Sequence, residues 1–146
     1  MSARALEQAG RVVDAQKARS EAEKLLRRDV AKETGHRMEL VETLLDYRER
    51  GAAKEARTLL KEEMKMRRSP EVLSALARAE ELCGDLEAAL GAAQASIASG
   101  FPDVYSYALL ARLERLAGNP MRGEVYARMA GGAEAPPLER PTAGAR

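Results

Sequence analysis

Two segments of this chain recur 34 residues later, and a repeat of that length allows few folds. Leu76–Gly84 (LARAEELCG) and Leu110–Gly118 (LARLERLAG) are identical at six of nine positions. Glu21–Leu26 (EAEKLL) and Glu55–Leu60 (EARTLL) are identical at four of six positions, at the same offset of 34. A fixed period of this size is typical of stacked units that bury a continuous core only by packing on their neighbours.

Glycine, proline and capping residues divide the chain into short helices. Gly51, Gly84 and Gly118 each follow a run with helical periodicity, where a left-handed residue closes a helix. Asp85 and Asn119 come next and are suited to cap the following helix. Further boundary signals are Ser69-Pro70-Glu71, Pro102-Asp103, Pro120, Gly35, Gly100 and the capping-box pair Ser20 and Glu23. Because the turns are short, neighbouring helices should run antiparallel.

We therefore expect an all-α domain over residues 1–132 that contains four helix pairs. These pairs span about 3–36, 37–69, 70–103 and 104–132. Residues 3–33 also allow one continuous helix, because Ala15–Arg19 contains no helix breaker. Residues 133–146 are rich in Gly, Pro and Ala. They can bury too little apolar surface to offset the conformational entropy lost on ordering, so we expect a disordered tail there.

Charge and composition set limits on the function. Lys and Arg number 24 against 23 Asp and Glu, so the chain lacks the basic excess expected of a nucleic-acid or membrane-surface binder. Aromatic residues make up 3% of the chain, which favours a core of closely packed Leu and Ala on helices. Cys83 is the only cysteine, and no apolar run has the length of a signal peptide or a membrane span. We expect a cytoplasmic protein without membrane insertion, and the Arg-, Ala- and Gly-rich usage is typical of a bacterial chain.

The repeat carries a recurring order of large and small residues. The four units read Leu6, Ala9-Gly10, Val13, Ala22 and Leu26; Leu40, Thr43-Leu44, Tyr47, Ala56 and Leu60; Leu73, Leu76-Ala77, Glu80, Ala89 and Ala93; Tyr107, Leu110-Ala111, Glu114, Gly123 and Ala127. This order resembles the tetratricopeptide repeat (TPR) family. The small residues, such as Ala111 and Gly123, should let two backbones approach closely, and Glu80 and Glu114 stand where the family has an aromatic residue.

The resemblance implies a right-handed α-solenoid whose concave groove, lined by the first helix of each pair, binds a peptide or helix of another protein. The groove positions are Met38, Val41, Leu45, Arg48, Ser74, Arg78, Tyr105, Ala108, Arg112 and Arg115. Arg78 and Arg112 are 34 residues apart and should form a ladder suited to bidentate binding of an acidic or carboxylate-ended partner. The alternative is that Arg78 pairs with Glu81 or Glu114 on a solvated face. The sequence leaves open whether the concave or the convex face binds.

No catalytic, metal or cofactor motif is visible, and we expect neither an enzyme nor a cofactor. His36 is the only histidine, so we interpret it as a surface loop residue rather than a metal ligand. The expected function is a non-catalytic protein-binding scaffold or adaptor. One alternative is a dedicated chaperone for a secretion or pilus subunit, a role typical of small bacterial TPR proteins. The other is a structural protein that self-associates through Val125, Tyr126 and Met129.

Overall fold

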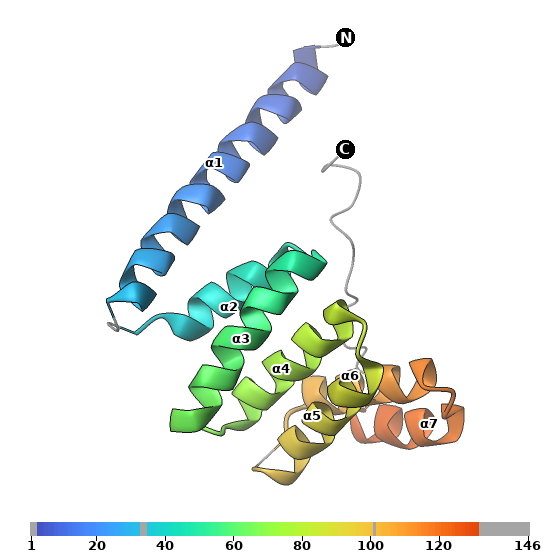
Figure 1. The fold of residues 1–146 in the computed structure, drawn as a ribbon. Helices are drawn as coiled ribbons and strands as arrows, with labels where there is room; N and C mark the ends of the chain where they lie inside the picture. Colours follow the sequence, from blue (N-terminus) through green and yellow to red (C-terminus); the bar gives the residue numbers. More distant parts are fainter. Residues whose placement is uncertain (1–2, 33–34, 101, 132–146) are drawn as a thin grey trace.

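The computed structural model describes residues 3–32, 35–100 and 102–131, and within these ranges the chain forms helices joined by turns, without strands (Figure 1). The helices are α1 (Ala3–Ala31), α2 (Arg37–Asp46), α3 (Arg50–Met66), α4 (Pro70–Cys83), α5 (Leu86–Ala98), α6 (Val104–Leu116) and α7 (Pro120–Met129). The predicted all-α class is confirmed. The predicted tail at 133–146 lies outside the described residues.

Helices α2 to α7 form three successive hairpins, α2–α3, α4–α5 and α6–α7 (Figure 1). Their first helices begin at Arg37, Pro70 and Val104, which are 33 and 34 residues apart, as the sequence repeat predicts. Each hairpin also packs on the next, through α3 with α4 and through α5 with α6. One apolar cluster lies between α2, α3 and α4, and a second lies between α4, α5 and α6.

The predicted boundaries of the last two hairpins are confirmed in atomic detail. Gly84 (φ 84°), directly after α4, and Gly118 (φ 82°), two residues after the last residue of α6, adopt the left-handed conformation. Asp85 caps α5 by accepting a hydrogen bond from the Ala88 amide at 2.9 Å. Pro120 is the first residue of α7, where its missing amide proton costs nothing.

One boundary prediction is wrong, and another is confirmed in its position but not in its hydrogen bond. Gly51 lies inside α3, because Arg48 (φ 55°) supplies the left-handed residue in the turn before that helix. Asn119 stands at the N-cap of α7, but its side-chain amide donates to Glu114 Oε2 at 2.9 Å and does not cap the helix. Glu114 stands where the repeat pattern has an aromatic residue, and it is almost fully buried. The hydrogen bond from Asn119 gives its buried carboxylate a partner.

The predicted first helix pair is also wrong, since α1 is one helix that runs through Ser20 without a break. This is the continuous helix that the uninterrupted Ala15–Arg19 stretch allows. Helix α1 is docked through its last turns: Leu26 and Val30 pack on the first apolar cluster, and Tyr47 donates its hydroxyl proton to Glu23. Figure 1 shows the rest of α1 extending away from the hairpins.

The small residues act as predicted in the last hairpin. A Cβ built on Gly123 would lie 2.9 Å from the carbonyl oxygen of Ala111, so α7 crosses α6 at a distance that only glycine permits. In α1, by contrast, Gly10 has no atom within 4 Å of its would-be Cβ among the described residues, because α1 has no antiparallel partner there.

Candidate functional site

The apolar residues predicted to line the groove are mostly in the core. Val41, Leu45 and Ala108 are 0%, 1% and 4% exposed, so the prediction that they contact a partner is corrected. Met38 packs against the first apolar cluster, and only Tyr105, at 59% exposure, is open to solvent. The physical reason is that each of these helices is contacted on more than one side: α2 by α1, α3 and α4, and α6 by α5 and α7. This leaves them a wide buried face.

The two ladder arginines are bound to carboxylates of the preceding hairpin. Arg78 Nη1 lies 2.8 Å from Glu42 Oε2 on α2. Arg112 donates from both terminal nitrogens to Glu81 on α4, at 2.7 and 2.9 Å. The ladder therefore connects α2, α4 and α6. This agrees with the alternative in which Arg78 forms an ion pair, although its partner is Glu42 and not Glu81 or Glu114.

The Glu81 carboxyl is largely buried and already bound to Arg112, which limits the access of a ligand to that arginine. Burial raises the pKa of Glu81, and the attraction of Arg112 opposes that shift only in part. A carboxylate from a partner could reach Arg112 only by displacing Glu81, and it would leave the displaced carboxylate in a largely buried place. Arg112 is hence a poor anchor for an acidic ligand.

The remaining groove candidates are dispersed. The Ser74 hydroxyl lies 2.8 Å from that of Ser96 and 3.4 Å from that of Ser106, and this network joins α4, α5 and α6 inside the domain. Arg48 lies in the turn between α2 and α3. Arg115 points its Nη2 to Glu124 of α7 at 3.7 Å. The ten predicted residues thus do not form one continuous open groove.

Helix α7 carries a stripe of exposed apolar side chains. Met121, Val125 and Met129 follow one another at four-residue spacing and are 83%, 56% and 53% exposed. Residues four apart lie on the same face of a helix, so they form one surface, which we call the α7 stripe. Two of the three residues predicted for self-association belong to it. The third, Tyr126, instead packs against the second apolar cluster.

The α7 stripe departs from the repeat. The small residue of the second helix in each hairpin is buried, and it is Ala56 in α3, Ala89 in α5 and Gly123 in α7. With these three residues aligned, each position of α7 has an equivalent in α3 and in α5. The stripe corresponds to Glu87, Gly91 and Ala95 in α5 and to Lys54, Thr58 and Glu62 in α3. Those residues are polar or small and, apart from a half-buried Ala95, exposed. The fold therefore does not require large apolar residues on this face.

The end of the array is polar by the same comparison. Leu90 of α5 packs on the second apolar cluster, which includes residues of the next hairpin. Its equivalent in α7 is Glu124, which is exposed and lies near Arg115 and Arg128. The residues of α3 and α5 at the stripe positions stay exposed, apart from Ala95, although a further hairpin packs on each of these helices, so the α7 stripe is an outward surface and not an unfilled stacking face.

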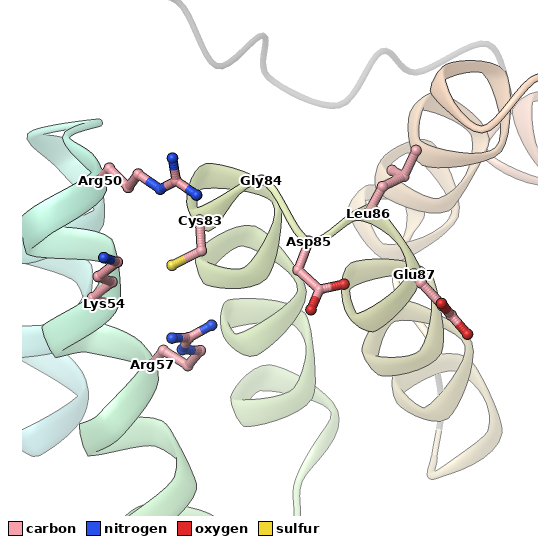
Figure 2. Close-up of a pocket in the computed structure, with 8 residues that line it drawn as sticks. All are labelled: Arg50, Lys54, Arg57, Cys83, Gly84, Asp85, Leu86 and Glu87. Atoms are coloured by element: carbon pink, nitrogen blue, oxygen red, sulfur yellow. The ribbon is translucent and has the colours of Figure 1, made fainter.

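A hollow of about 500 Å³ lies between α3 and the turn from α4 to α5. Figure 2 shows Arg50, Lys54 and Arg57 of α3 on one side of it. The other lining residues are Cys83, Gly84, Asp85, Leu86 and Glu87. Arg57 is engaged, since its Nη1 lies 3.1 Å from Oε2 of the buried Glu80. Sequence reasoning missed this site, although the spacing of the three cations puts them on one helix face.

His36 lies directly before α2, and its Nδ1 is 3.5 Å from a carboxylate oxygen of Glu39. Within the described ranges, no group of three His, Cys, Asp or Glu residues is placed to hold a metal ion. No helix in the described part of the chain is long and apolar enough to cross a membrane. Comparison with protein-family models, curated proteins and solved structures finds no match to this chain.

Proposed function

We propose that the protein is a non-catalytic, cytoplasmic binding scaffold, built as a right-handed TPR-like α-solenoid, that holds a partner protein against the α7 stripe. The observation that carries this proposal is the exposure of Met121, Val125 and Met129 at positions where α3 and α5 are polar or small. Exposed apolar patches of this kind on an otherwise polar surface mark interaction sites.

The chemistry of the α7 stripe indicates the type of partner. Three apolar side chains along about two turns match the apolar face of an amphipathic helix or peptide. Covering each half-exposed Val or Met would contribute about 1 kcal/mol or more. Methionine, with its flexible and polarisable side chain, suits a surface that adapts to its ligand.

The introduction of a single charge tests the proposal. Val125→Glu should abolish capture of partner proteins from a cell extract, because it puts a carboxylate in the centre of the α7 stripe. The matched control is Thr58→Glu, at the equivalent exposed position of α3. Circular dichroism should show equal helicity for all three proteins, since neither position is buried. Equal capture by wild type and Val125→Glu would contradict the proposal.

The same surface also supports a second candidate, self-association of this chain. Sedimentation velocity over a range of protein concentrations separates the two. A wild type that stays monomeric while it captures a partner supports the adaptor. A dimer that forms with concentration and is lost in Val125→Glu supports self-association.

A further inference from the structure

The two ladder arginines of the predicted groove are already paired. Arg78 and Arg112 are neutralised by Glu42 and Glu81. In the hollow of Figure 2, Arg57 is likewise neutralised by Glu80. Its two neighbours on the same face of α3, Arg50 and Lys54, have no ion pair or hydrogen bond from their side chains within the described part of the chain.

Neither of the two carboxylates that line the hollow is hydrogen-bonded or ion-paired to Arg50 or Lys54 within the described part of the chain. The Asp85 carboxylate is used as the cap of α5 and accepts a hydrogen bond from the Ala88 amide. Glu87 points away from the three cations in Figure 2. Arg50 approaches the turn itself, with its Nη2 3.7 Å from the place of a Cβ on Gly84. The α3 side of the hollow therefore presents two cations, Arg50 and Lys54, that are not bound to a carboxylate of the described chain.

The shape of the hollow favours a chain segment over a small ion. At about 500 Å³ it is much larger than one phosphate or carboxylate, and it is open to solvent rather than enclosed. Arg50 and Lys54 are one helical turn apart, which places them about 5–6 Å from each other at the level of Cβ. Carboxylates on alternate residues of an extended peptide are about 6–7 Å apart along the chain, and thus match this spacing.

We propose that the hollow between α3 and the α4–α5 turn binds an acidic peptide segment, with its carboxylates on Arg50 and Lys54. Arg50 offers a planar fork for bidentate pairing, and Lys54 offers a second point charge. The proposal adds a second contact to the proposed function, namely a polar one to an acidic stretch of a protein partner. It uses residues other than the α7 stripe, so each can fail alone.

The test is an amide NMR titration of the labelled full chain with a capped pentapeptide of sequence EELEE at low salt. We expect shifts confined to Arg50, Lys54 and the turn at Gly84. The double variant Arg50→Gln/Lys54→Gln should bind ~10-fold more weakly, because two exposed charge pairs with the peptide are lost together. The matched control, Lys17→Gln/Lys24→Gln on exposed positions of α1, should bind like wild type.

Three outcomes would overturn the proposal. The first is an equal loss of binding in the α1 control, which would indicate general attraction to positive charge. The second is inorganic phosphate giving the same shifts and displacing the peptide, which would assign the hollow to a free oxyanion. The third is binding of the neutral peptide QQLQQ as tightly as EELEE.

Arg50 lies close to the C-terminus of α4 and could stabilise it, in which case the double variant would lose stability. The single variant Lys54→Gln then still tests peptide binding. It should weaken peptide binding with an unchanged urea midpoint, and unchanged binding would refute the proposal. The Val125→Glu protein should still bind EELEE, which separates this site from the α7 stripe.

Discussion

Replacing Gly123 by alanine gives a sharp test of how α7 packs on α6. The new Cβ would lie 2.7 Å from Cγ of Arg115 and 2.9 Å from the backbone oxygen of Ala111. The Arg115 side chain is half-exposed and can move, but the Ala111 carbonyl is part of α6. The substitution must therefore push the two helices apart.

The expected magnitude is the difference between two opposing effects. Alanine in a helix interior is more stable than glycine by about 0.5–1 kcal/mol. Overpacking against a fixed neighbour costs about 1–3 kcal/mol. Gly123→Ala should therefore lower the free energy of unfolding by about 0.5–2 kcal/mol. The matched control is Gly91→Ala in α5, where no described atom lies within 4 Å of the new Cβ. That control should raise the free energy of unfolding by about 0.5–1 kcal/mol.

Urea denaturation followed by circular dichroism measures both variants against wild type, with equal m-values required for the comparison. The critical result is that the free energy of unfolding changes in opposite directions in the two variants, although both replace a helical glycine by alanine. A Gly123→Ala protein as stable as Gly91→Ala would refute the close helix approach described here.

Three further substitutions test the core and the electrostatics. Leu45→Ala should cost about 2–5 kcal/mol in urea denaturation, because Leu45 is 1% exposed and not a groove residue; a cost below 1 kcal/mol would contradict its burial. Tyr47→Phe removes the hydrogen bond that lowers the pKa of Glu23, so that pKa should rise in a carboxyl NMR titration, and an unchanged value would refute the contact. The stability from Glu23 is present above its ordinary pKa and is lost as pH falls, and this acid-sensitive part should shrink in Tyr47→Phe. Arg112→Gln should raise the pKa of Glu81 further, because burial already raises it and Arg112 opposes this shift. A raised folded-state pKa gives stability that is lost as pH rises, so this variant should lose more stability at pH 7 than at pH 4, and an equal loss would count against the pair.

Much of the fold could be predicted because the signals that end and begin its helices are local in the sequence. Gly84 with Asp85, and Pro120, each act within a few residues of themselves, and the structure confirms them. The 34-residue offset gives the spacing of the hairpins, which the starts of α4 and α6 confirm. The turn before α3 could not be predicted in this way. There Arg48 takes the left-handed conformation that the sequence assigns to Gly51, so the surrounding packing and not the residue type decides it.

The binding residues were harder to predict, because repeat position gives the helix face but not what covers it. Val41 and Leu45 have the spacing of a groove face, yet α3 and α4 enclose them. Arg78 and Arg112 were correctly placed as equivalent positions, but their acidic partners come from neighbouring hairpins. Met121 was overlooked because only the comparison with α3 and α5 shows that its position is normally polar.

The partial docking of α1 has a consequence for how that helix behaves in solution. Side chains of residues 8–22 are exposed, apart from a half-buried Val12, and Gly10 lies among them. A helix of this length without tertiary contacts is marginal in water, and an interior glycine weakens it further. Backbone amides near Gly10 should therefore exchange with solvent through local fraying, while those near Leu26 open only when the first hairpin does. One continuous helix would thus contain two parts of very different lifetime, with the change near Glu23.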